Sequence, residues 1–95
     1  MEEHINQNCP LCGKIASFVF KDYQQYKLFS CTVCKVFVIP EQQEEFIKSR
    51  DQSLRSQFSN TSSKLSSDML LQISVELVGN SPQIFPNKVL RANWH

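Results

Sequence analysis

The residues of this sequence best suited to chemistry are its four cysteines, which occur as two Cys-x-x-Cys pairs. Cys9 pairs with Cys12 and Cys31 pairs with Cys34, and eighteen residues separate the pairs. This spacing is typical of a zinc site, because each pair forms a tight turn with both sulfurs on one side. Two facing turns supply four thiolates at the corners of a tetrahedron, about 2.3 Å from the metal. Because four sulfur ligands leave no position for water, the sequence predicts one structural Zn²⁺.

Other uses of the cysteines are a redox-active dithiol, disulfides, an iron–sulfur cluster or a different metal. A redox dithiol needs a single Cys-x-x-Cys at a helix start within a βαβ unit, and neither pair has that setting. His4 is a further candidate ligand. Since four sulfurs already complete the site, we expect His4 to be a solvated tail residue.

The segments Cys9–Gly13 (CPLCG) and Cys31–Cys34 (CTVC) resemble the zinc-ribbon class of small metal-binding modules over about the first forty residues. In zinc ribbons the residue after each cysteine pair is often glycine, because the chain turns there through a left-handed conformation. Gly13 matches this pattern and Lys35 departs from it. The longer pattern, which continues through Phe-Val-Ile into a helix, resembles uncharacterised bacterial and phage zinc-ribbon proteins. That resemblance implies an accessory or recognition subunit, for example in anti-phage defence or a phage-related system.

Three short apolar segments connect and follow the cysteine pairs, at residues 15–20, 26–30 and 36–39. Their β-branched and aromatic residues predict three antiparallel strands, and the two cysteine turns that bind the metal form two corners of this sheet. A two-residue period places Phe18 and Phe20 on one face of this sheet and Val19 on the other.

A helix is expected from about Glu41 to Phe58, because Pro40 closes the third strand and acidic residues precede basic ones. Glu44 and Lys48 have the spacing of a supportive ion pair. An apolar stripe at helical spacing predicts that the helix packs on another surface. The stripe comprises Phe46, Ile47, Leu54 and Phe58.

The C-terminal part combines a polar segment with an alternating one. Residues 59–67 are serine-rich and predict a loop, whereas the alternation across 71–77 predicts a half-buried strand. A helix capped at Ser67 is the alternative. A turn at 79–82 and a short, interrupted extended segment follow. The predicted fold is therefore α+β, with a three-stranded antiparallel zinc ribbon at 1–40. A helix and a short β or irregular segment form a second region at 41–95.

Composition and charge limit which partners and which cellular location the protein is expected to have. The formal net charge is +1, so bulk charge gives no support to nucleic-acid binding. No apolar run approaches the roughly 20 residues that span a bilayer. The N-terminus has no signal-peptide pattern, so we expect a cytoplasmic protein with reduced cysteines and no membrane contact.

The sequence favours a non-enzymatic protein without a small-molecule substrate. The only glycines are Gly13 and Gly79, so no phosphate-binding loop is present, and no cysteine remains for nucleophilic work. Helix-start acids account for the carboxylates at 41–45.

We expect a small adaptor that binds a larger protein or forms a homodimer. Its predicted surface comprises Tyr23 and Tyr26 at the strand-connecting turn and the helix stripe of Phe46, Ile47, Leu54 and Phe58. Internal packing is the alternative for that stripe. A different function is nucleic-acid binding, in which bases stack on aromatic rings of the ribbon while lysines meet phosphates. The lysines are Lys14, Lys21, Lys27 and Lys35, and in the competing interpretation they only solvate the edges of the sheet.

Overall fold

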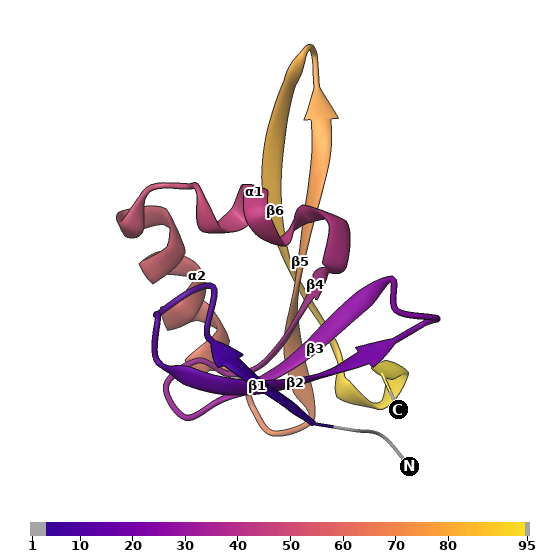
Figure 1. The fold of residues 1–95 in the computed structure, drawn as a ribbon. Coiled ribbons are helices and arrows are strands. Elements are labelled where there is room, and N and C mark those ends of the chain that lie inside the picture. The colour runs from indigo at the N-terminus through magenta and orange to yellow at the C-terminus, as the bar shows by residue number, and fades with distance from the viewer. Residues whose placement is uncertain (1–3, 95) are drawn as a thin grey trace.

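A computed structural model describes residues 4–94, and the chain forms one six-stranded sheet with two short helices against it (Figure 1). The strands, in both sequence and sheet order, are β1 (Ile5–Asn8), β2 (Ile15–Lys21), β3 (Tyr26–Cys31), β4 (Lys35–Pro40), β5 (Met69–Val78) and β6 (Ser81–Leu90). The helical elements are η1 (Glu41–Gln43), α1 (Glu44–Lys48), α2 (Gln52–Ser63) and η2 (Arg91–Trp94). β4 and β5 are parallel, and all other neighbours are antiparallel.

The predicted fold class is wrong. The three expected strands are present as β2, β3 and β4, but they do not form a separate ribbon followed by one amphipathic helix. They are the centre of a mixed, mostly β structure, because β1 extends one edge and the β5–β6 hairpin extends the other. One sheet therefore contains strands from both predicted regions, 1–40 and 41–95. The outer ends of those ranges, residues 1–3 and residue 95, lie outside the described residues.

Aromatic rings on one face of the sheet form the centre of the core. Phe18 pairs across to Phe29, which pairs in turn to Phe37, and the Phe29 and Phe37 rings stack with centroids 5.1 Å apart. Phe18 and Phe20 contact edge to face at 5.3 Å, which confirms their predicted placement on the same side. Ile47 of α1 and Phe58 of α2 are buried in the same cluster, so both helices cover this face.

The single helix expected over 41–58 is broken at residues 49–51. The Ser49 hydroxyl donates to the Phe46 carbonyl at 2.7 Å, and Asp51 adopts an extended ψ of 145° as the N-cap of α2. The serine hydroxyl competes with the helical backbone for hydrogen bonds, which favours a break at this point.

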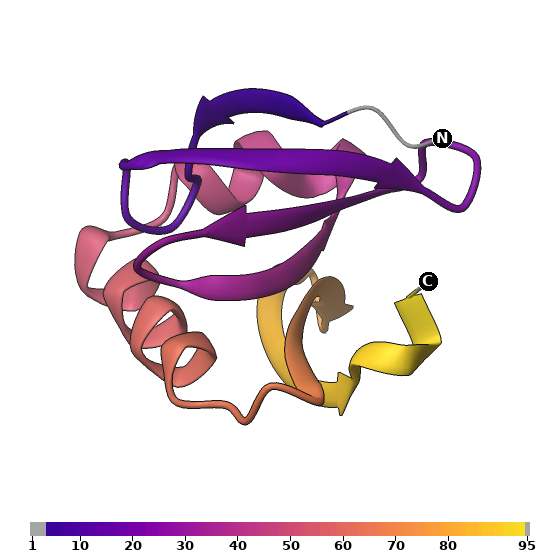
Figure 2. The same ribbon diagram turned by 90° about the horizontal axis from the view of Figure 1, so that it is seen from below.

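The serine-rich segment expected to be a loop begins instead as helix, because α2 continues to Ser63. Ser59 and Ser62 are buried and hydrogen-bonded to the second cysteine turn. Tertiary contacts therefore outweigh the low intrinsic helix propensity of this segment. In the view of Figure 2, α2 lies beside the turn that joins β3 to β4.

The strand predicted from alternation at 71–77 is confirmed as part of β5. Leu71 and Ile73 are buried in the core, and Leu71 pairs with Phe37 of β4. The return strand is continuous, contrary to the expected interruption, because β6 runs from Ser81 to Leu90 through Pro82 and Pro86. An edge strand tolerates proline where the missing N–H faces away from its neighbour. Beyond the core, the hairpin projects away from the body (Figure 1).

None of the helices within residues 4–94 combines the length and the hydropathy needed to span a membrane.

Candidate metal centre

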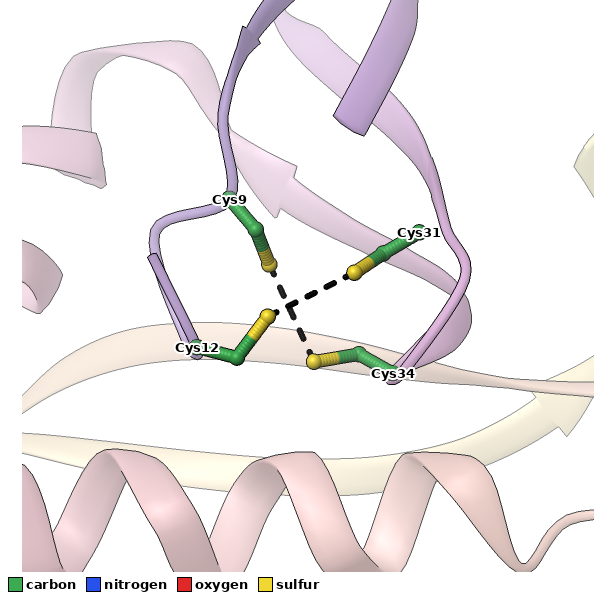
Figure 3. A group of neighbouring side chains, drawn as sticks. All are labelled: Cys9, Cys12, Cys31 and Cys34. Carbon is green, nitrogen blue, oxygen red and sulfur yellow. Dashed lines mark hydrogen bonds between the residues drawn. The ribbon is translucent and has the colours of Figure 1, made fainter. Parts of the chain in front are cut away.

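The four cysteines come together at one end of the sheet, where the β1–β2 and β3–β4 connections face each other (Figure 3). Their Sγ atoms all lie within 4.8 Å of one another. The Cys9 and Cys34 sulfurs are 3.8 Å apart, and the Cys12 and Cys31 sulfurs are 3.5 Å apart. His4 is exposed and does not belong to this cluster.

Backbone hydrogen bonds shape the first cysteine turn. The Gly13 N–H donates to the Cys9 carbonyl at 2.9 Å, and the Cys9 N–H donates to the Lys14 carbonyl at 2.6 Å. Gly13 adopts the left-handed φ of 80° predicted for it. Lys35 holds the equivalent place after the second pair with a φ of 69°, so the chain is left-handed after both pairs although only one has glycine.

The cluster is largely shielded from water. Cys9, Cys31 and Cys34 are buried, whereas Cys12 is half-buried. The sulfurs border the same apolar core that contains the stacked phenylalanines. A charged ligand set in this position needs a compensating cation, because an isolated buried charge is costly.

The donor set fits a tetrahedral metal ion. At a zinc–sulfur distance of about 2.3 Å, the corners of a tetrahedron lie about 3.8 Å apart. The Cys9–Cys34 and Cys12–Cys31 sulfur separations, 3.8 and 3.5 Å, have this value within a few tenths of an ångström. All four cysteines are free thiols, so every sulfur is available as a ligand. The cluster can therefore hold one metal ion.

The thiols also influence one another. A hydrogen bond from Cys34 lowers the pKa of Cys9 to about 5, against the effect of burial. The same contact, together with burial, raises the pKa of Cys34 above its usual range. Metal binding displaces the thiol protons, because thiolates and not thiols are the ligands.

Two serines of α2 complete the surroundings of the cluster, and sequence reasoning missed both. Ser59 Oγ lies 2.9 Å from Cys34 Sγ. Ser62 Oγ donates to the backbone carbonyls of Cys34, at 2.5 Å, and Val36, at 3.3 Å. Their three-residue spacing, which puts two hydroxyls on one helical face, was the available signal. It was hidden because the whole segment is rich in serine.

The helix stripe predicted as an interaction surface faces inward. Ile47 and Phe58 are buried, and Leu54 packs against the core. Phe46 is only half-buried, and the Arg50 guanidinium lies 4.2 Å from its ring centroid. Covering the sheet therefore uses most of the apolar area of this stripe.

The two tyrosines at the strand-connecting turn differ. Tyr23 is 96% exposed at the tip, in a turn where Asp22, Tyr23 and Gln24 all have positive φ. Tyr26 is half-buried, and its ring contacts Trp94 of η2 edge to face at 5.0 Å. Only Tyr23 offers a freely accessible ring.

The four candidate nucleic-acid lysines do not form one surface. Lys14 and Lys35 are exposed at the cysteine turns, whereas Lys27 is mostly buried against Glu44. Lys21 is half-buried at the opposite end of β2. Most of the aromatic rings assigned to base stacking, including Phe18 and Phe29, belong to the core.

Comparisons of the chain with protein-family models, with curated proteins and with solved structures find no match. The resemblance to zinc ribbons therefore rests on the cysteine pattern and the sulfur geometry.

Proposed function

We propose that this protein binds one Zn²⁺ through Cys9, Cys12, Cys31 and Cys34, and that the ion has a structural role. The observation that carries this proposal is the convergence of the four sulfurs within 4.8 Å of one another. Four soft thiolates at tetrahedral spacing favour zinc, with iron as the other metal that such ligands bind. Four protein ligands fill a tetrahedral ion, which favours a structural over a catalytic site.

Energetics support a structural role. A structural zinc contributes an apparent binding free energy of about 10–16 kcal/mol, which is linked to folding. A folded domain has a net stability of only about 5–15 kcal/mol. The ion joins the β1–β2 and β3–β4 turns at the end of the sheet where α2 docks. We therefore expect the fold to depend on the metal.

Metal analysis tests this proposal. Purified protein should contain one zinc per chain by elemental mass spectrometry. Cys31→Ser should lose the metal and the cooperative unfolding transition, whereas Ser53→Ala, at an exposed position of α2, should retain both. A wild-type protein that is well folded without metal would contradict the proposal, and a stoichiometric iron content would correct the identity of the ion.

We further propose that the protein acts as a small non-enzymatic interaction subunit, with a larger protein or a second copy as its partner. Support comes from the projecting end of the β5–β6 hairpin, where Leu77 is 76% and Val78 54% exposed. A two-stranded hairpin without further packing is only marginally stable in water, so a partner surface would stabilise it. The helix stripe faces the core and is not part of this surface. Nucleic-acid binding has less support, because its lysines and rings are divided between core and surface.

Affinity purification of the tagged protein from its native cell, with and without nuclease, tests this role. A stoichiometric protein that survives nuclease treatment is expected, or a dimer by light scattering. The double variant Leu77→Thr/Val78→Thr should abolish either association. Ile15→Thr is the matched control, since Ile15 is a 68% exposed apolar strand residue next to the first cysteine turn. Recovery of nucleic acid alone would instead favour the alternative.

A further inference from the structure

We infer that Ser59 is a positioning residue of the metal centre, whose hydroxyl donates a hydrogen bond to the Cys34 thiolate and couples metal binding to the docking of α2. This inference rests on the proposed zinc site. The contact is direct, with Ser59 Oγ 2.9 Å from Cys34 Sγ. Both residues are buried, so water does not readily replace either partner.

The direction of this hydrogen bond follows from the chemistry of the ligand. A cysteine that binds zinc does so as a thiolate, which has no proton to donate. The Ser59 hydroxyl must then be the donor and the sulfur the acceptor. A hydrogen bond to an ionised acceptor is stronger than one between neutral groups.

Four thiolates around one divalent ion leave a net negative charge, and at Cys34 that charge lies in the interior. A donor aimed at the sulfur disperses part of the charge and fixes the direction of its lone pairs. Groups that hydrogen-bond to metal ligands in this way typically change metal affinity 10–100-fold when they are mutated.

The same helix also fixes the backbone of the second cysteine turn. Ser62 donates to the Cys34 carbonyl, so one turn of α2 holds both the side chain and the main chain of a single ligand. Ser59 and Ser62 are three residues apart and lie on one face of the helix. Correct seating of α2 therefore positions the Cys34 sulfur, and a bound ion in turn favours the seated helix.

Three variants separate a role at the sulfur from a general role in packing. Ser59→Ala removes the donor to sulfur, and Ser59→Thr retains a hydroxyl. Ser53→Ala is the matched control, because it makes the same change at an exposed serine of the same helix. Zinc affinity is measured by competition with a chromogenic chelator, and Co²⁺ replaces zinc to give a thiolate-to-metal charge-transfer band.

Ser59→Ala should bind zinc 10–100-fold more weakly than wild type and shift the Co²⁺ charge-transfer band. Ser59→Thr should restore affinity and band position, and Ser53→Ala should leave both unchanged. A wild-type protein that binds zinc, together with a Ser59→Ala variant of equal affinity and identical Co²⁺ spectrum, would overturn the inference but leave the zinc site intact. Failure of wild type to bind either metal would overturn both. If Ser59→Ala does not fold, a Ser59→Thr variant with wild-type affinity still supports the inference, and a folded Ser59→Thr that has lost affinity contradicts it.

Discussion

The ammonium of Lys27 in β3 forms a largely buried ion pair with the carboxylate of Glu44 in α1, with Nζ 2.5 Å from Oε1. The Lys27 and Glu44 side chains are only 13% and 7% exposed. Gln7 of β1 joins them, donating to Glu44 Oε2 at 2.7 Å and accepting from Lys27 Nζ at 3.2 Å. The Lys27 ammonium also lies 4.3 Å from the centroid of the Phe18 ring. Lys27, which was named from the sequence as a candidate phosphate contact, therefore links the sheet to α1.

Glu44→Gln should destabilise the fold by about 3 kcal/mol, because it leaves the Lys27 ammonium buried without an opposite charge. Urea unfolding at pH 7 with excess zinc measures the change. Glu45→Gln is the control, since its side chain is 89% exposed and it forms only a long, 3.6 Å contact with Lys48. Equal effects of the two substitutions would show that the Lys27–Glu44 pair contributes no more than a surface charge.

The contribution of Glu44 should depend on pH. Burial favours the neutral carboxyl, but hydrogen bonds from Lys27, Gln7 and Lys48 outweigh it and hold the pKa of Glu44 below its usual range. A lowered folded-state pKa means that the stabilisation is present above the unfolded pKa, about 4.3, and is lost as pH falls through the folded value. The stability difference between wild type and Glu44→Gln should therefore be constant from pH 7 to about 4.3 and shrink below it. Both proteins are measured in saturating zinc over the pH range in which both retain the ion, so the difference isolates the carboxyl; a difference that grows in acid would contradict the assignment.

Lys35→Gly should stabilise the protein by about 1 kcal/mol. Lys35 has a φ of 69°, and a left-handed conformation costs a residue with a side chain about 1–2 kcal/mol. Glycine avoids that cost but loses more conformational entropy on folding. Lys14→Gly, at an exposed position without positive φ, is the control and should be destabilising or neutral. Thermal unfolding with excess zinc gives both values, and equal losses in the two variants would show that Lys35 is not strained.

Removal of metal should abolish the native tertiary structure. A strong chelator is expected to eliminate the near-ultraviolet circular dichroism of the packed aromatic rings, because the two cysteine turns are then no longer joined by a metal ion. Added Zn²⁺ should restore the signal and Mg²⁺ should not, since Mg²⁺ prefers oxygen ligands. A signal that persists in excess chelator would show that packing alone maintains the fold.

Pro82 and Pro86 should protect the free edge of β6. They lie four residues apart, so their nitrogens face the same side of a strand whose other side pairs with β5. Proline on an edge strand removes donors that would recruit another strand. The double variant Pro82→Thr/Pro86→Thr should raise the apparent mass at high concentration in light scattering. Gln83→Thr, on the same strand, is the control that changes no donor; an unchanged mass in the double variant would remove this role from the prolines.

Local patterns in the sequence were sufficient for several elements. The cysteine spacing identified the residues that converge, because a Cys-x-x-Cys turn is a local structure. Alternation identified β5, and the apolar segments identified β2 to β4. Each of these features depends on residues that are close together in the sequence, so a short segment is enough to predict it.

The helix break at Ser49–Asp51 and the short strand β1 have only weak signals in the local sequence. Ile5–Asn8 is mostly polar and has no alternation, so it is a strand only because β2 offers its edge. The helix was expected to continue because ion-pair spacing and an apolar stripe persist through the break. The Ser49 hydroxyl bond to the Phe46 carbonyl and the extended backbone of Asp51 interrupt the helix nonetheless.

The sequence by itself determined the four cysteines that converge, the strands next to them and the strand at 71–77, since each depends on short-range spacing. The tertiary structure alone decided that β4 lies at the centre of one sheet, with β5 parallel to it. It also decided that Glu44 is buried against Lys27 and that Ser59 contacts Cys34. Those partners are 17 and 25 residues apart in the chain. These distant residues meet because the sheet and the helices bury their apolar surfaces against each other. No local sequence pattern predicts such contacts.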